Sequence, residues 1–295
     1  MSGHNLNRIL HPNIKPFVRS FGFSVSGVND CLLCLDATDR FENRCIGIFG
    51  SKPSCRGVTN DIVAACATLA VLDAKRGAPT VLCRNAAPRG IETQSIVTEK
   101  PENGTPFGFI RYHRTLITST LKRYEFSLEK KFLGVQTFGL LDVQKVMEFM
   151  VDLGRVTQEH AAHVCNSQYR SFEFQPDAAG WLLAQENLPY TEVSMSEIPD
   201  LPGVVWKIDN FGNCCTTLET REVPEAIRGG TIETKSWGRL PYYPRLADVP
   251  KGKAALVSGS SGYGFGTSKR FLEIVIGGMG DAARTLGIKV GDEVF

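Results

Sequence analysis

The chain has 295 residues, of which 42% are hydrophobic and 22% charged; these values are ordinary for a soluble protein of about two domains with a sizeable core. The formal net charge is +2 and no basic run occurs, which argues against a nucleic-acid partner. No apolar run approaches the roughly 18 residues that span a bilayer, and the first residues lack the apolar core of a secretory signal. We therefore expect neither a membrane nor a nucleic-acid partner.

The nine cysteines are scattered, mostly in apolar surroundings. Cys31 and Cys34 have the CxxC spacing of metal sites, but no second pair lies at zinc-finger distance, and the leucines between them favour a buried strand. We interpret the thiols as small buried hydrophobes in a reducing compartment. The expectation is a cytoplasmic protein without a metal site.

The first half of the chain predicts an α/β layer. Residues 1–20 are expected to form an arm, and the short apolar runs 31–39 and 45–50 to form strands. The clearest helix spans 59–77, with capping residues at its start and a glycine at its end. Residues 79–85 are the next strand. This strand, helix, strand order predicts a mostly parallel sheet.

The next segments continue this pattern up to residue 190. Residues 107–132 alternate like strands, 140–154 have apolar residues at helical spacing, and 176–188 predict a short helix with proline at its start. Residues 189–203 hold three prolines and little apolar periodicity, which indicates a linker. The first domain is therefore expected to span residues 1–190.

Beyond the linker, the chain predicts a second domain, residues 191–295, made of short strands. Five segments have strand character: 203–209, 214–219, 229–237, 254–261 and 270–278. Their length and spacing are typical of a small antiparallel β-domain. The glycine-rich stretch 259–269 lacks the following helix that a phosphate loop needs, so a mobile hairpin loop is favoured. Closure of that loop over a site stays open.

Three histidines are candidates for chemistry. His160 and His163 lie three residues apart, a spacing that presents two imidazoles on one helical face. No third metal ligand stands out, so a solvated face is favoured. His113 is a general-base candidate, although a surface strand is the simpler interpretation. No nucleophile elbow or Cys/His pair supports hydrolase triad chemistry.

Several segments of the chain resemble one known family. "IDNFGNCCTTL" (208–218) is similar to the Asp-x-Phe-Gly-Asn-x-x-Thr signature of the S-adenosylmethionine hydroxide adenosyltransferases and their fluorinase and chlorinase relatives. "TSKRFLEIVIGGMGDAARTLGIKVGDEV" (267–294) resembles the segment that closes their β-domain. "YRSFEFQPDAAGWLL" (169–183) and "KPENG" (100–104) match two shorter anchors in the same order. The family's two N-terminal nucleophile-activating motifs have no clear counterpart.

The resemblance implies an N-terminal α/β sandwich and a C-terminal antiparallel β-barrel. It also implies a homotrimer, with the site at the subunit interface and S-adenosylmethionine as substrate rather than cofactor. The reaction implied is displacement of methionine at the ribose C5′ by water, which gives adenosine and L-methionine. A sulfonium is already a good leaving group, so the protein mainly positions water and excludes bulk solvent.

The resemblance carries roles to individual residues. Asp209 would accept from the methionine ammonium, Ser268 would contact the amino-acid end, Phe211 would stack near the adenine, and Asn213 would hydrogen-bond nearby. Other substrate-binding residues are Arg270, the backbone of Gly277 and Gly278, and Asn103. The catalytic candidates are Arg170, His113 and Asp39. For Asp209, the alternative is a turn residue that bonds its own backbone, and Tyr169 stands where halide-handling relatives carry serine.

Two further functions stay open beside the hydrolase. One is a diverged protein that binds an adenosine-type ligand without turning it over, which the missing N-terminal motifs favour. The other is an enzyme of the same fold that acts on another substrate with catalytic groups from Asp36, Asp39, Arg89 or His113.

Overall fold

The computed structural model describes residues 23–29, 35–75, 77–86, 106–121, 123–167, 169–223, 230–264, 269–278 and 280–295. The chain divides into two compact units, Met1–Pro199 and Asp200–Phe295; the sequence had placed the boundary after residue 190. The expected arm and the Cys31–Cys34 pair lie outside the described residues. None of the helices in the described ranges combines the length and the apolar character that a bilayer crossing needs.

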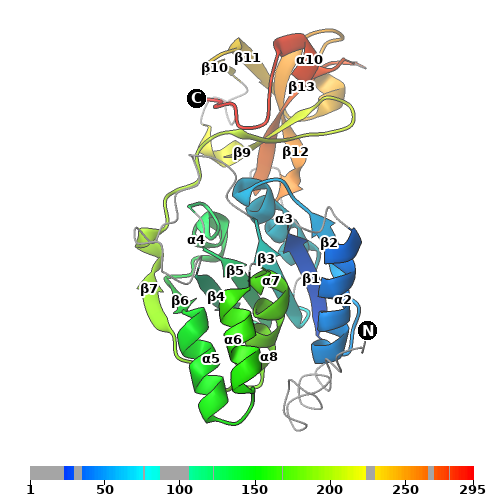
Figure 1. Ribbon diagram of the computed structural model, residues 1–295. Helices are drawn as coiled ribbons and strands as arrows, with labels where there is room; N and C mark the ends of the chain where they lie inside the picture. The colour runs from blue at the N-terminus through cyan, green and yellow to red at the C-terminus, as the bar shows by residue number, and fades with distance from the viewer. Residues whose placement is uncertain are drawn as a thin grey trace. The chain divides into compact units, whose positions relative to one another are not determined.

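A seven-stranded sheet with the order β2-β1-β3-β5-β4-β6-β7 forms the centre of the first unit (Figure 1). Its strands are β1 (Ser24–Asn29), β2 (Ser54–Gly57), β3 (Thr80–Asn85), β4 (Phe107–Tyr112), β5 (Thr115–Thr120), β6 (Thr137–Leu141) and β7 (Thr191–Ser194). Strands β2, β1, β3 and β5 pair in parallel, whereas β5, β4, β6 and β7 pair antiparallel. The predicted α/β class is confirmed, with the parallel strands in the first half of the sheet.

Helices cover the two faces of this sheet. They are α2 (Leu35–Phe49), α3 (Asp61–Ala74), α4 (Ser127–Leu133), α5 (Val143–Asp152), α6 (Gln158–Asn166), α7 (Arg170–Glu173) and α8 (Gln175–Leu183). Helices α2, α5, α6, α7 and α8 share one buried apolar core with β1, β3 and β4. Helix α3 contacts α4, β1 and β3, and the right-handed crossovers on either side of β2 place it on the face opposite α2.

The predicted helix at 59–77 is confirmed as α3, and its cap explains where it begins. The Asn60 side chain accepts a hydrogen bond from the Val63 backbone N–H at 2.9 Å. This bond satisfies one of the free donors of the first turn. Eight residues of α3 are buried, so its apolar character reflects a helix enclosed between the sheet and α4.

The prediction of strands at 31–39 and 45–50 was wrong for its described part, because residues 35–49 form α2. Phe41, Cys45, Ile48 and Phe49 are all buried in the core of the first unit. Their spacing places them on one face of a helix, which packs closely against α8. A Cβ added at Gly180 of α8 would lie 2.9 Å from Ile48 Cγ2.

The prediction of an unstructured linker at 189–203 was wrong in its first half. Residues 191–194 form β7, which pairs with β6 over four residue pairs, and the 3₁₀ turn η3 (Met195–Glu197) follows. The Met195 side chain is buried. Because β7 extends the first sheet, this segment belongs to the first compact unit.

The second unit contains a six-stranded sheet with the order β10-β11-β12-β13-β9-β8. Its elements are β8 (Val205–Ile208), β9 (Cys214–Glu219), β10 (Thr231–Thr234), β11 (Gly238–Tyr243), β12 (Ala254–Gly262), β13 (Arg270–Ile276) and α10 (Ala282–Leu286). The five predicted strands are present, and β11 is additional. Neighbouring strands are antiparallel except β11 and β12, which run parallel.

The expected closed barrel is not found among the described residues, where β8 and β10 are the edges of an open sheet. Closure would require β8 to pair with β10. Instead, the Val205 N–H donates to the Asp292 carbonyl and the Gly291 N–H donates to the Val205 carbonyl. The C-terminal segment therefore takes the backbone groups that a closing strand would use.

Candidate functional site

The turn Asp209–Asn213 connects β8 to β9 and is fixed by one carboxylate. Asp209 Oδ1 accepts the backbone N–H groups of Phe211 at 2.8 Å and Asn213 at 2.9 Å, and Oδ2 accepts the Asn213 side-chain amide at 3.0 Å. Gly212 adopts a φ of +80°, a conformation that favours glycine. Within this unit, the contacts of Asp209 are those of a turn residue that bonds its own backbone, the alternative given from the sequence.

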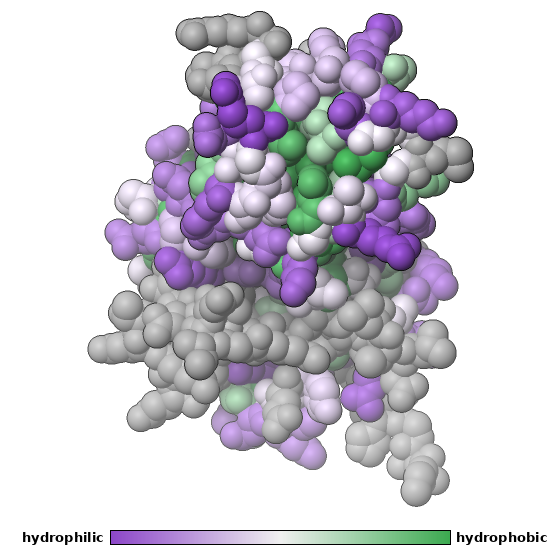
Figure 2. Space-filling view, turned by 90° about the horizontal axis from the view of Figure 1, so that it is seen from above, coloured by the Kyte–Doolittle hydropathy of each residue, from purple (hydrophilic) through white to green (hydrophobic). Residues whose placement is uncertain are grey.

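The same turn presents an aromatic ring to the outside. Phe211 is 78% exposed, while Cys214 immediately after the turn is fully buried. Figure 2 shows hydrophobic residues reaching the surface between hydrophilic ones on one face of the molecule. An exposed aromatic side chain on a turn whose backbone N–H groups are held by the Asp209 carboxylate offers a flat surface on which a planar ligand can stack.

The glycines that follow β13 and the Asp209–Asn213 turn lie at the same end of the strands, because Ile274 near the end of β13 pairs with Cys214 at the start of β9. A Cβ at Gly277 would lie 2.2 Å from the Pro250 carbonyl oxygen, and Gly278 has a φ of +84°. Both positions therefore require glycine. The chain then returns to the turn, where the Ala283 N–H donates to the Gly212 carbonyl at 3.0 Å.

Arg270 lies toward the other end of β13, where it pairs with Gly262. Its guanidinium donates to the Ser260 carbonyl at 3.2 Å. Arg270 and Ile274, the partner of Cys214, are about 13 Å apart along the strand at 3.3 Å per residue. The structure thus places Arg270 away from the Asp209 turn, and Ser268 lies outside the described residues.

Glu273 is a candidate site residue of this sheet that was not predicted from the sequence. Glu273 faces Cys215 across β13 and β9, and Cys215 in turn pairs with Lys207 of β8. Burial raises the pKa of Glu273 above its ordinary value, and the charge of Asp209 adds to this effect. Its Oε1 accepts the Ser260 N–H at 3.3 Å. The sequence signal was an acid inside the apolar run "RFLEIVIGG".

In the first unit, the strand order predicts where a ligand would bind. The connection from β1 leads to β2 on one side, and the chain then returns past β1 to β3 on the other. Ligands of open α/β sheets bind at such a switch point, beyond the carboxyl ends of the strands. Here those ends are Asn29 and Asn85. The segments that follow, with Arg89 and Asn103, lie outside the described residues.

A buried charge network holds the carboxyl end of β3. Arg84 is fully buried and contacts Glu129 Oε1 at 2.7 Å, Glu125 Oε1 at 3.0 Å and Ser119 Oγ at 3.1 Å. Its carbonyl accepts the Gln175 side-chain amide of α8 at 2.8 Å. Burial raises the pKa of Glu129 above its ordinary value, although the Arg84 charge opposes this. Arg84 thus links β3, β5, α4 and α8 beside the switch point.

Two of the three catalytic candidates come from neighbouring elements. Arg170 begins α7, is half-buried, and has its pKa lowered by burial. The preceding Tyr169 is 53% exposed, and the Arg40 guanidinium of α2 lies 5.9 Å from its ring centre. Asp39 is exposed beside Arg40. The contact between Arg40 and Tyr169 therefore brings the first turns of α2 and the start of α7 together.

His113 is located elsewhere. It lies in the turn between β4 and β5, and its φ is +50°. The carbonyl of the next residue, Arg114, accepts the N–H of Thr80, the first residue of β3. Because β3 and β5 are parallel, this turn is at the edge opposite their carboxyl ends. The structure does not bring His113 to the switch point.

The His160–His163 pair lies on α6, with ring centres 6.4 Å apart. His163 Nε2 is 3.1 Å from Glu173 Oε1. Burial lowers the pKa of His160. Within the described ranges, no group of three or more His, Cys, Asp and Glu side chains has the arrangement of a metal site.

Comparison with known proteins gives a family for the second unit and a fold for the whole chain. Residues 203–295 match the model of the SAM hydroxide adenosyltransferase C-terminal domain. The crystal structure of an uncharacterized conserved protein from Thermotoga maritima is similar with a TM-score of 0.56 and 14% identity, covering 91% of this chain and 97% of that one. A conserved hypothetical protein from Thermus thermophilus has a TM-score of 0.47 and 19% identity over the same shares. At 14% identity, the similarity to the Thermotoga protein supports the fold but no function.

Proposed function

From the match of residues 203–295 to the SAM hydroxide adenosyltransferase C-terminal domain, we propose that the chain binds S-adenosylmethionine and displaces its methionine with water. The observation that carries the proposal is the Asp209–Asn213 turn. It matches the family signature, and it holds Phe211 78% exposed on a fixed backbone. This arrangement suits the adenine ring, whose π-face stacks on aromatic side chains.

The chemistry asks little of the protein beyond positioning. Oxygen of water forms a bond to C5′ while the C5′–S bond breaks, and the electron pair of that bond remains on sulfur. Methionine leaves as a neutral thioether, and the attacking water releases one proton. The protein contributes in-line placement of water and exclusion of solvent. Within this proposal, Arg170 and Asp39 orient the water, and the switch point of the first unit is its location.

Within this proposal, Glu273 interacts with the positive charge of the substrate. Burial and the charge of Asp209 both raise the pKa of this carboxyl, whereas a sulfonium or ammonium group nearby would lower that pKa and favour the ionised form. Binding would then release protons, and affinity would increase as the pH rises through the pKa of Glu273. The Glu273→Gln variant would bind more weakly and lose this pH dependence.

Replacement of Phe211 gives the sharpest test of ligand binding. Asp209→Asn alters the turn as well as the site, because the new amide would point a donor at the Asn213 amide that Oδ2 now accepts. Phe211→Ala leaves those bonds in place, because the Phe211 ring is 78% exposed. We expect this variant to weaken S-adenosylmethionine binding about 10- to 100-fold by calorimetry, the range of a lost base stack. Phe295→Ala, with an aromatic ring 47% exposed, is the matched control. Equal binding by both variants contradicts the proposal.

Turnover separates the enzyme from a binding protein. Purified protein is incubated with S-adenosylmethionine, with and without chloride, and the products are chromatographed. Adenosine and methionine support the hydrolase. Bound but intact substrate supports the second candidate, a non-catalytic binding protein, which the position of His113 at the opposite sheet edge favours.

A trimer with shared sites is the remaining part of the proposal, together with a cytoplasmic location. Light scattering measures the mass of the assembly. If each site combines two subunits, mixing Phe211→Ala and Arg170→Ala chains, each with reduced activity, would raise the activity above that of either variant alone, because some mixed sites contain neither change. Activity that does not rise in a verified mixed trimer contradicts a shared site.

A further inference from the structure

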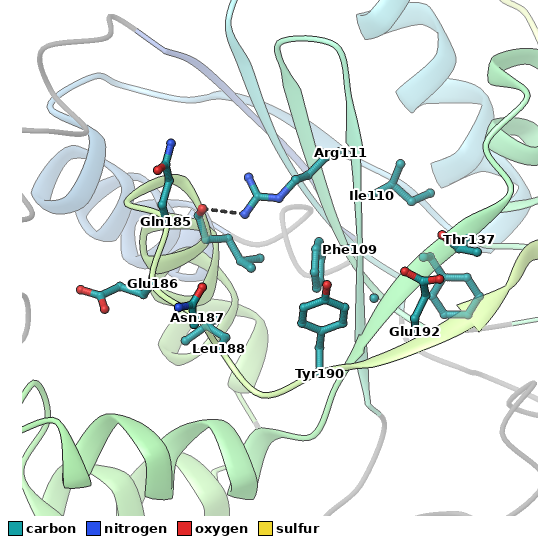
Figure 3. A pocket seen from close by; sticks show the side chains of 13 residues that line it. Phe109, Ile110, Arg111, Thr137, Gln185, Glu186, Asn187, Leu188, Tyr190 and Glu192 are labelled. Atoms are coloured by element: carbon teal, nitrogen blue, oxygen red, sulfur yellow. Dashed lines mark hydrogen bonds between the residues drawn. The ribbon is translucent and has the colours of Figure 1, made fainter.

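The first unit contains a pocket at the end of the sheet where β5 begins, away from the switch point. Its volume is about 370 Å³, within the range of small-molecule sites. It is bounded by β4, β6, β7 and the chain that follows α8. Figure 3 shows Phe109 and Tyr190 between Arg111 on one side and Glu192 on the other.

The aromatic centre of this pocket is built into the sheet. Phe109 pairs with Gly139, and Gly139 pairs with Glu192, so the three form one row across β4, β6 and β7. A Cβ at Gly139 would lie 2.1 Å from the Phe109 ring, so the ring rests on bare backbone. Tyr190 meets Phe109 edge to face at 5.2 Å and is itself 54% exposed. Tyr190 therefore offers one ring surface to a ligand.

The two charged groups are available for a ligand. Arg111 donates to the Leu182 carbonyl at 2.7 Å and lies 5.9 Å from the Phe109 ring centre. Among the described residues no carboxylate pairs with it. Glu186 at the rim is already 3.3 Å from Arg155, which leaves Glu192 as the acceptor on the opposite side. Burial of part of the guanidinium lowers the pKa of Arg111, but the residue as a whole is exposed, so an anion can reach the N–H donors that Leu182 does not use.

We propose that this pocket binds a molecule with a planar ring, an acidic group at one end and a hydrogen-bond donor at the other, such as a nucleoside monophosphate whose base carries an exocyclic amino group. The acidic group binds Arg111, the ring packs on Tyr190, and the amino group donates to Glu192. A free α-amino acid fits poorly, because it carries both charges on one carbon. The inference does not rest on the proposed reaction.

AMP, adenosine and IMP dissect these contacts by calorimetry in the Phe211→Ala background, which removes the ring proposed to bind adenine in the second unit. Adenosine lacks the anion and IMP lacks the amino donor, so both should bind about 10- to 100-fold more weakly than AMP. Arg111→Gln should reduce AMP binding to the level of adenosine, with Arg111→Lys intermediate, because lysine keeps the charge but loses the fork. Glu192→Gln should abolish the preference for AMP over IMP.

Arg239→Gln, an exposed arginine of the second unit, is the matched control and should leave all three affinities unchanged. Circular dichroism checks that each variant is folded, and Glu192→Gln keeps the test valid if loss of the Arg111–Leu182 bond disturbs the fold. Three results in the Phe211→Ala background would overturn the proposal: no AMP binding at millimolar concentration, AMP affinity unaffected by Arg111→Gln, or equal affinity for AMP and IMP while Glu192 is intact.

Discussion

Removal of the Arg84 guanidinium should be among the most damaging single changes in the chain. The fully buried Arg84 contacts two carboxylates, Glu125 at 3.0 Å and Glu129 at 2.7 Å. Arg84→Met keeps much of the side-chain volume but leaves both acids buried without their cation. Breaking a buried pair in this way costs about 3–5 kcal/mol. That is a large fraction of the 5–15 kcal/mol that typically separates folded and unfolded domains.

The pH dependence of this loss identifies its cause. Burial raises the pKa of Glu129 even with Arg84 present, and removing Arg84 raises it further. A carboxyl whose pKa is higher in the folded than in the unfolded state stabilises the fold at low pH, and this stability is lost as the pH rises through the folded pKa. The difference between parent and variant should therefore be largest near pH 7 and shrink on acidification toward the ordinary pKa of glutamate.

Urea unfolding followed by circular dichroism at pH 7 and pH 5 measures this difference. Arg84→Met combined with Glu125→Gln and Glu129→Gln should recover part of the lost stability, because the buried charges are removed together. Arg239→Gln controls for the loss of one positive charge at an exposed position. A cost below about 1 kcal/mol at pH 7, where paired buried charges predict several, would refute the reasoning. So would a cost that grows on acidification.

Three further predictions follow from local geometry. Gly212→Ala should destabilise the protein by about 1–3 kcal/mol in urea unfolding, because the φ of Gly212 is +80° and the new Cβ would lie 2.1 Å from Asp281 Oδ1. Gly238→Ala is the control, because Gly238 has a φ of +69° but no neighbour within 4 Å, and it should cost less. Equal costs of the two substitutions would contradict the role of Asp281. Asp209→Asn should lower the thermal midpoint and Asp209→Asn with Asn213→Asp should restore it, since the swap re-forms the donor–acceptor pair. Burial lowers the pKa of His160, so the stability it contributes is present above its unfolded pKa near 6.5 and is lost as the pH falls through the folded pKa. His160→Gln should therefore reduce the loss of unfolding free energy on acidification. An unchanged slope of unfolding free energy against pH would exclude His160 as the source of that loss.

The sequence predicts an element well where its own residues supply the signal. Helix α3 has a capping asparagine, an acid in its first turn and a mostly apolar body, and the Asn60–Val63 bond shows that Asn60, one of the two predicted capping residues, is its cap. Helix α2 lacks such signals. Its buried residues Cys45 and Ile48 were interpreted as part of a strand, because the surface of α8 that they contact comes more than a hundred residues later. Periodicity in a short apolar run does not decide between helix and strand.

In the candidate site, too, the features set by nearby residues were predictable and those set by distant residues were not. The turn at 209–213 was predictable because Asp, Asn and Gly each favour turns for reasons internal to the residue. The position of Arg270 was not, because it depends on the register of β13 against β9 and on which end of the strand faces the turn. Arg84 was placed correctly in a strand, yet its partners Glu125 and Glu129 are about forty residues distant and their approach depends on the packing of α4.

The resemblance to a family carried further than any single residue, because it fixes the order of segments rather than their contacts. The family that it named is the one whose C-terminal domain model matches residues 203–295, but it also suggested a closed barrel, and here the C-terminal segment occupies the edge of β8. The same limit applies to chemistry. A signature preserves the turn that holds Phe211, since that turn is a local property of five residues. In the proposed reaction, turnover would require side chains distant in the sequence to meet the reacting carbon, which no local pattern encodes, so chromatography of the products tests the enzymatic step independently of the signature.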